Sequence, residues 1–150
     1  MADATAFVGA KLALYLGDDL AVILRDETPG LTFAGHWDFP GGGREGDEGP
    51  LACALRECHE ELGLRVPKPA IIWQRAFDED AQTKWFFVAR LPAAAVADVV
   101  FGDEGQRWSL MKPQEYLTHA KAIPSFQYRL RTFLDEEAAT HSGAESPPLI

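Results

Sequence analysis

The sequence predicts an α/β (α+β) fold in which a mixed β-sheet lies between helices, as an α/β/α sandwich. Segments with a two-residue apolar repeat, or with many β-branched and aromatic residues, indicate strands, and segments with apolar residues at helical spacing alternate with them. The chain has 150 residues, 47% of them hydrophobic, which suits one ordinary domain with a core. We expect a single domain over residues 1–138 and a mobile tail over 139–150, where Ser, Gly and Pro occur without periodicity.

The first two elements are expected to form a β-hairpin. Residues 7–16 carry leucines at every second position from Leu12, which is the repeat of a strand. A turn is expected at residues 17–19, because it contains glycine and two aspartates. The short apolar run 20–24 is typical of a strand that is covered on both faces.

A third strand is expected to lead into a run of glycines. Residues 28–34 contain a Pro-Gly pair and no clear period, which predicts a loop with a strand fragment at 31–33. Residues 37–39 are the expected strand before Pro40 and the glycines 41–43. Proline lacks an N–H and glycine loses the most backbone entropy on ordering, so we expect this run to be a loop rather than a helix or regular strand. Its backbone can approach a ligand closely.

The clearest helix is expected to begin near Pro50. Proline suits the first helical position, and the preceding Asp47 and Glu48 suit the positive end of a helix dipole. At about 100° per residue, five apolar side chains form one stripe toward a core, and Gly63 is the expected stop. The five are Leu51, Ala54, Leu55, Cys58 and Leu62.

The second half of the chain continues the alternation of strands and helices. Its strands are rich in β-branched and aromatic residues, and its last helix has apolar residues at helical spacing. In chain order, we expect strands at 70–77 and 84–91 with a polar link at 78–83, a short helix or loop at 93–99, a loop at 102–106, a strand at 108–111, and helices at 113–118 and 124–137.

Three glutamates share one edge of the helix that begins near Pro50. Glu57, Glu60 and Glu61 stand at i, i+3 and i+4, within about one quadrant beside the apolar stripe. Like charges at this spacing destabilise a bare helix by a few tenths of a kcal/mol per pair, and partial burial would add to that cost. A hard divalent cation resolves the conflict, because Mg²⁺ prefers carboxylate, phosphate and water oxygens. The alternative is a solvated acidic face on which Arg56 pairs with Glu60.

The spacing around these glutamates resembles the Nudix box, G-x5-E-x7-R-E-U-x-E-E-x-G-U, in which U is an apolar residue. The matching stretch begins at Gly42, passes through Glu48 and ends with residues 56–64, and every fixed position matches. Cys58 stands at the first U, where a buried free cysteine behaves as a small hydrophobe. The resemblance implies the Nudix α/β/α fold over about residues 5–137. It also implies a hydrolase that acts on a nucleoside diphosphate linked to another group.

The same resemblance implies a set of metal ligands. Glu57 and Glu61 are the leading ligands, and Glu60 is a further ligand or a proton acceptor. The carbonyl of Gly41 or Gly42 supplies another hard oxygen. The expected cofactor is Mg²⁺, with Mn²⁺ as a substitute. Because metal-bound carboxylates titrate as a coupled set, the general base is not assigned to one residue.

Further residues are expected to support this chemistry. Arg56 and Glu48 resemble positions that orient the helix glutamates through an ion pair. Glu104 resembles a loop glutamate that reaches the metals in the MutT group, with Asp103 as its substitute if the register differs by one. The alternative for Glu104 is an ordinary polar turn.

The sequence does not identify one substrate. Arg25 and Asp38 are the candidate substrate-binding residues; an arginine suits phosphate oxygens, and Asp38 lies in the expected strand that leads into the glycine run. Marks of known Nudix subfamilies are missing: there is no SQPWPFPxS stretch, and Asp80 stands where ADP-ribose enzymes tend to have Pro and dinucleoside polyphosphate enzymes Tyr. Size and the Glu104 loop favour a MutT-like pyrophosphatase of nucleoside triphosphates, including oxidised purine nucleotides. A nucleotide-sugar or ADP-ribose-type pyrophosphatase and a non-catalytic nucleotide sensor are the alternatives.

The charge, the cysteine content and the apolar segments of the sequence limit the kinds of partner that we expect. The net charge of −9 argues against long nucleic acid as a ligand, but it is compatible with a small nucleotide bridged by metal. Cys53 and Cys58 form neither a C-x-x-C motif nor a disulfide framework, which favours a reducing compartment. No segment reaches the ~18 apolar residues needed to cross a bilayer. We expect a cytoplasmic monomer or homodimer without a membrane partner.

Overall fold

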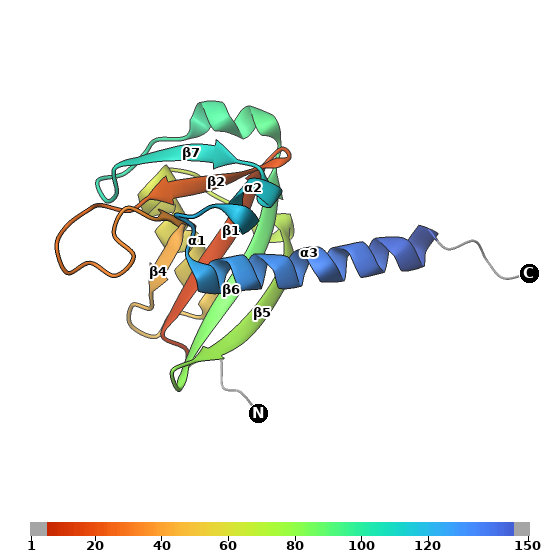
Figure 1. The fold of residues 1–150 in the computed structure, drawn as a ribbon, viewed down its shortest axis with the longest axis horizontal. Coiled ribbons are helices and arrows are strands. Elements are labelled where there is room, and N and C mark those ends of the chain that lie inside the picture. The colour runs from red at the N-terminus through yellow and green to blue at the C-terminus, as the bar shows by residue number, and fades with distance from the viewer. Residues whose placement is uncertain (1–5, 146–150) are drawn as a thin grey trace, which may run out of the picture.

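The computed structural model describes residues 6–145, and within them a mixed sheet lies between helices, so the expected fold class is confirmed (Figure 1). The strands of this part of the chain are β1 (Gly9–Leu16), β2 (Asp19–Leu24), β3 (Trp37–Asp38), β4 (Gly41–Gly43), β5 (Ile71–Glu79), β6 (Gln82–Leu91) and β7 (Arg107–Met111). Its helices are α1 (Pro50–Leu62), α2 (Pro113–Thr118) and α3 (Pro124–Glu145), with short 3₁₀ helices η2 (Lys68–Ala70) and η3 (Ala93–Asp98).

The sheet has the order β3-β2-β1-β6-β5, and β1 lies at its centre. Strand β1 runs parallel to β6 from Gly9, opposite Lys84, to Leu16, opposite Leu91. On its other side, β1 pairs antiparallel with β4 at its start and with β2 at its end, while β7 pairs with β2. The beginning of β1 therefore lies between the glycine strand and β6.

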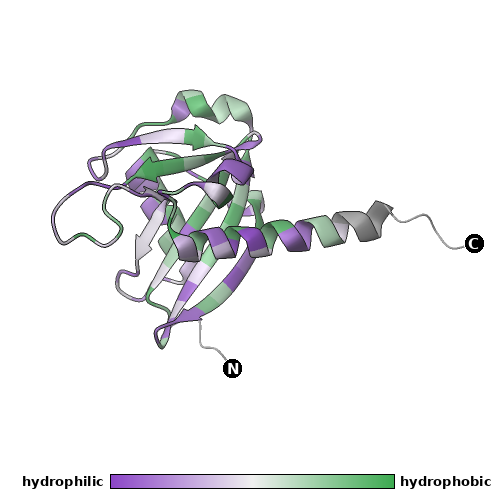
Figure 2. Ribbon diagram, viewed as in Figure 1, coloured by the Kyte–Doolittle hydropathy of each residue, from purple (hydrophilic) through white to green (hydrophobic). Residues whose placement is uncertain are grey.

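Alternation along the central strands separates two apolar clusters. The leucines of β1 from Leu12 onward pack on the face covered by α1, where Cys58 and Leu62 are fully buried. Ala13 and Tyr15 belong to the opposite cluster, with side chains of α2 and α3. Figure 1 shows α3 crossing the near face of the sheet with α1 behind it, and Figure 2 shows apolar stretches along the central strands.

The glycine run forms a strand, so its prediction as a loop was wrong. Strand β4 pairs with β1, and Gly41 has φ of 136°, where a Cβ would collide with the carbonyl oxygen of Ala10. The absence of side chains lets β4 approach β1 this closely, and the ladder outweighs glycine's entropy cost. The strand fragment predicted at residues 31–33 was also wrong. No strand forms there: residues 32–35 form a turn, and Phe33 has φ of 53°.

Three other elements extend further than expected. Strands β5 and β6 continue to Glu79 and from Gln82, so the predicted polar link shrinks to a turn at Asp80 and Ala81. Both turn residues have positive φ, as a type I′ hairpin turn requires. Helix α3 continues past residue 137 to Glu145, through alanines that favour helix, and projects beyond the sheet in Figure 1. Thus residues 139–145 of the predicted tail are helical, and 146–150 lie outside the described residues. The domain boundary at 138 stays a prediction.

Candidate functional site

Helix α1 begins and ends where the sequence predicts. Pro50 follows the N-cap Gly49, and the C-cap Gly63 has a left-handed φ of 68° and donates its N–H to His59. Asp47 and Glu48 precede the N-cap, and no acidic residue lies in the first turn, so their expected effect on the helix dipole stays a prediction. Glu48 is bound by Arg56 of the helix.

The glycine strand lies directly against the glutamates of α1. The N–H of Gly41 donates to Glu61 Oε1 over 2.7 Å. A Cβ built on Gly42 would stand 2.7 Å from Glu57 Oε2, a distance that real Cβ atoms essentially never show. Glycine at these positions therefore lets the backbone and the carboxylates of α1 meet, whereas the expected close approach to a ligand stays a prediction.

Arg56 connects the acidic residues of this region. Its Nε and Nη2 donate to the two oxygens of Glu48 over 3.0 and 2.8 Å. Its Nη1 lies 3.3 Å from Glu57, 3.1 Å from Glu60 and 3.3 Å from Glu45. The hydrogen bond from Arg56 lowers the pKa of Glu48 to about 2. The i,i+4 pair of the alternative interpretation thus exists, but it is one contact within a larger network that includes two residues preceding the helix.

The box glutamates differ in their exposure. The Glu60 side chain is 54% exposed, whereas that of Glu57 is 18% exposed. Burial raises the pKa of Glu57, and Arg56 opposes that shift. Burial also raises the pKa of Glu61, to about 7, against the opposing effects of Lys11 and the Gly41 N–H. Glu57 and Glu61 are therefore carboxylates whose surroundings only partly compensate their negative charge.

Sequence reasoning missed Lys11, which supplies a cation at this position. Its Nζ donates to Asp38 Oδ2 over 3.1 Å, to the Gly41 carbonyl over 3.0 Å and to the Phe39 carbonyl over 3.3 Å. Arg25 also faces Asp38, at 3.8 Å. The available signal was a lysine interrupting an apolar strand, but only the pairing of β1 with β4 shows what it contacts.

A polar cavity of about 400 Å³ brings most of the predicted site residues together. Seven carboxylates and two cations line it. The predicted residues among its lining are Glu57, Glu60, Glu61, Glu104, Gly41, Gly42, Arg25 and Asp38. Arg56 and Glu48 are not part of this lining, and they act on it through the contacts described above.

Glu104 reaches the cavity because its loop is attached at both ends. Gly102 donates its N–H to the Glu61 carbonyl of α1 over 2.9 Å. On the other side, Gly105 donates to Asp26 Oδ2 over 3.2 Å. These bonds join the loop to α1 and to the segment after β2, so Glu104 and the box glutamates lie around one space.

The oxygen-rich lining fits a hard divalent cation in its donor chemistry. Carboxylate and backbone carbonyl oxygens are the ligands that Mg²⁺ and Mn²⁺ prefer, and Gly41 already presents its carbonyl to the ammonium of Lys11. Among residues 6–145, no group of three or more His, Cys, Asp or Glu side chains is arranged to hold a metal ion. Glu57, Glu60 and Glu61 therefore lie at neighbouring positions around the cavity, but their carboxylates do not meet at one point. Arg56 pairs with two of them, Glu57 and Glu60.

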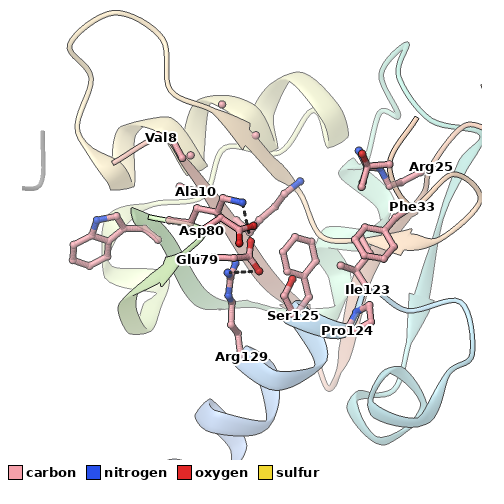
Figure 3. Close-up of a pocket in the computed structure, with 18 residues that line it drawn as sticks. Val8, Ala10, Arg25, Phe33, Glu79, Asp80, Ile123, Pro124, Ser125 and Arg129 are labelled. Carbon is pink, nitrogen blue, oxygen red and sulfur yellow. Dashed lines mark hydrogen bonds and ion pairs between the residues drawn. The ribbon is translucent and has the colours of Figure 1, made fainter. Parts of the chain in front are cut away.

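A second cavity, of about 680 Å³, adjoins the first (Figure 3). The two share Lys11, Arg25, Gly42 and Gly43 in their linings. Trp85 lines the larger cavity. Phe33 and Phe126 also line it and were missed, because only the tertiary structure brings their segments together.

Comparisons with known proteins agree with this geometry. An RNA pyrophosphohydrolase of Tolumonas auensis is 33% identical over 87 residues, covering 47% of this chain and 50% of that protein. One of Francisella tularensis subsp. mediasiatica is 31% identical over 86 residues, covering 54% and 50%. The chain thus spans about half the length of the curated relatives it matches.

Solved structures show the same fold. A MutT protein from Methanosarcina mazei Go1 has a TM-score of 0.69 at 22% identity, covering 91% of this chain and 99% of that one. A C. elegans Ap4A hydrolase has a TM-score of 0.68 at 19% identity, covering 87% and 98%. The sequence model of the NUDIX domain matches residues 9–132, which is most of the chain. The sequence resemblance is therefore confirmed, and this chain belongs to the NUDIX family.

Proposed function

We propose that this protein is a pyrophosphohydrolase that cleaves a nucleoside diphosphate derivative by attack of water on phosphorus, with a divalent metal as cofactor. The observation that carries the proposal is the joining of two cavities of different character. One is lined by seven carboxylates, among them the box glutamates, and the other contains Lys84 and Arg129 and aromatic rings. Lys11 and Arg25 line both, as a ligand with phosphates in one cavity and a nucleoside in the other requires.

The residues that would hold Mg²⁺, or Mn²⁺ in its place, are Glu57 and Glu61 with a carbonyl of Gly41 or Gly42. Glu60 and Glu104 are the further candidates. When bound, the ion neutralises phosphoryl oxygens and lowers the pKa of water. A structural neighbour from Francisella tularensis, a bifunctional NMN adenylyltransferase/ADP ribose pyrophosphatase, was solved with AMP and a Mn ion, which supports this cofactor class for the fold.

The chain's own cations have two roles in this proposal. Arg56 holds Glu57 and Glu60 in place and is itself held by Glu48 through two hydrogen bonds. Lys11 and Arg25 lie where the cavities meet and bind the substrate phosphates, and Asp38 positions both side chains. The carboxylates of the site accept the proton that water loses, and we assign this role to the coupled set.

The substrate we favour is a nucleoside triphosphate, as in MutT-like enzymes that also act on oxidised purine nucleotides. A cavity of about 680 Å³ lies within the range of small-molecule sites, roughly 300–1,000 Å³. The curated relatives are named RNA pyrophosphohydrolases, but the net charge of −9 disfavours a long RNA here. Nucleotide sugars and ADP-ribose derivatives are the alternative substrates. No helix in residues 6–145 is long and apolar enough to cross a membrane, and we propose a cytoplasmic monomer or homodimer.

A nucleotide panel tests the proposal. The protein is incubated with Mg²⁺ and nucleoside triphosphates, nucleotide sugars and ADP-ribose. Chromatography follows the nucleoside mono- and diphosphates that form, because nucleotide sugars and ADP-ribose would release a sugar phosphate rather than phosphate or pyrophosphate. We expect turnover of at least one member that is lost in Glu57→Gln and kept in Glu115→Gln, an acidic control on α2. Tight binding without turnover would favour the nucleotide sensor. A melting temperature that Mg²⁺ and nucleotide leave unchanged would favour a purely structural acidic domain.

A further inference from the structure

We propose that Arg129 and Glu79 read the base of the substrate and make the larger cavity selective for guanine over adenine. The inference rests on the proposed function, because it concerns the nucleoside whose phosphates lie in the acidic cavity. It extends the proposed function by naming the base of the substrate and two residues outside the Nudix box that recognise it.

Arg129 is a buried cation that lines the larger cavity. The residue is 3% exposed, and its guanidinium lies 5.1 Å from the Phe77 ring centroid and 5.6 Å from that of Phe126. Its Nη2 is 3.7 Å from Glu79 Oε2, which is too long for a hydrogen bond. Figure 3 shows Arg129 rising from α3 toward Glu79 at one side of the cavity. Within residues 6–145 the Arg129 side chain donates no hydrogen bond, and Arg129 lines the cavity, so its N–H groups are available to a ligand there.

Glu79 provides acceptors beside these donors. Its Oε1 accepts a hydrogen bond from Lys84 Nζ over 2.8 Å, while its Oε2 faces Arg129. The hydrogen bond from Lys84 lowers the pKa of Glu79, so the side chain is a carboxylate at neutral pH and can only accept. The cavity thus carries a donor group and an acceptor group next to each other.

This order of groups matches guanine and opposes adenine. Guanine has an acceptor, O6, next to the donors N1–H and the 2-amino group, and arginine is the commonest partner of its O6 and N7. Adenine has a donor, its 6-amino group, where guanine has O6. Arg129 therefore donates to O6 while Glu79 accepts from N1–H and the 2-amino group. With adenine, two donors would face each other.

Other features of the cavity support a base rather than a phosphate at this end. Lys84 and Arg129 line this end together with Glu79 and Asp80, so the two cations are balanced by two carboxylates and do not form a positive phosphate site. Phe126 and Phe33 supply aromatic surface, and stacking on aromatic rings accepts every base. Selection among bases therefore depends on the hydrogen bonds of Arg129 and Glu79.

The test compares kcat/KM for nucleotides that differ only in the base, using GTP, ITP and ATP, and GDP- and ADP-linked sugars as a second matched pair. We expect GTP to exceed ATP by about ten- to a hundredfold, since a good bidentate contact contributes that much discrimination. ITP lacks the 2-amino group and should lie between them. Equal values for GTP and ATP in the wild type, or a higher value for ATP, would overturn the proposal.

Variants assign the effect to the two residues. Arg129→Lys keeps the charge but loses the planar fork, so the GTP/ATP ratio should fall toward one through a loss on GTP. Glu79→Gln should remove the advantage of GTP over ITP, and Arg131→Gln, an exposed position on the same helix, should leave both ratios unchanged. A thermal melt shows whether Arg129→Lys folds. If it does not, the GTP/ITP ratio of Glu79→Gln, a substitution at a partly exposed position, tests the assignment. A guanine preference that survives in every folded variant would refute the assignment.

Failure of the proposed function has a different signature. If the wild-type protein turns over no nucleotide, the hydrolase assignment fails, and base reading is then measured by calorimetry with GMP and AMP. Tighter binding of GMP that is lost in Glu79→Gln supports the inference, and equal binding overturns it.

Discussion

Replacing the partly buried acid Glu61 by glutamine should stabilise the metal-free protein at alkaline pH. Glu61 accepts the Gly41 N–H over 2.7 Å, and the glutamine carbonyl oxygen can accept the same bond. What the substitution removes is a negative charge that burial disfavours, since the pKa of Glu61 rises from 4.5 to about 7. Between these values the folded chain holds more protons than the unfolded chain, so stability falls as the pH rises.

The size of the effect follows from this shift. In the window between the two pKa values, the wild-type free energy of unfolding should fall by about 1.4 kcal/mol per pH unit because of this group. From about pH 5 to about pH 8, the wild type therefore loses about 2–3 kcal/mol that Glu61→Gln retains. Other titrating groups are common to both proteins and cancel in the comparison.

Urea unfolding of both proteins across this pH range, with EDTA present, measures the difference. Glu60→Gln is the matched control, because its side chain is more than half exposed and its removal should change stability by only a few tenths of a kcal/mol. Added Mg²⁺ at about pH 8 should raise the wild-type melting temperature more than that of Glu61→Gln, since the ion binds the carboxylate. Parallel pH profiles of wild type and Glu61→Gln would refute the argument that this buried charge is poorly compensated.

Three further outcomes test the site. Glu57→Gln should lower kcat by orders of magnitude while the circular dichroism spectrum stays unchanged, and full activity would rule out its role as a metal ligand. Gly41→Ala should cost at least ~1 kcal/mol in urea unfolding, because its Cβ meets the Ala10 carbonyl at a φ of 136°; Gly43→Ala, where a Cβ meets nothing within 4 Å, is the control. EDTA should abolish turnover and Mg²⁺ should restore it, whereas activity in excess chelator would contradict a metal-dependent reaction.

Local patterns predicted the elements whose formation depends on nearby residues. Helix α1 begins at Pro50 and ends before Gly63 as expected, because proline and a left-handed glycine act on their own backbone. The leucines from Leu12 onward lie on one face of β1, since alternation is a property of any strand. The spacing of the box likewise indicated which glutamates share an edge of α1.

Elements that depend on a distant partner were predicted poorly. Glycines 41–43 have little intrinsic preference for a strand, and they form β4 because β1 pairs with them. At Gly41 that pairing leaves no room for a side chain against β1. The turn between β5 and β6 forms at Asp80 and Ala81, with both φ values positive, because long-range pairing carries the strands to that point.

The sequence by itself determined the family, the helix that carries the glutamates and the acidic chemistry of the site, because each depends on the spacing of residues within one short stretch. Only the tertiary structure decided which distant groups meet that helix. Lys11 lies against the glycine strand, Glu104 enters the acidic cavity, and Arg129 reaches Glu79 beside the larger one. Their positions depend on strand pairing and helix packing across the whole chain, and no local pattern encodes such contacts.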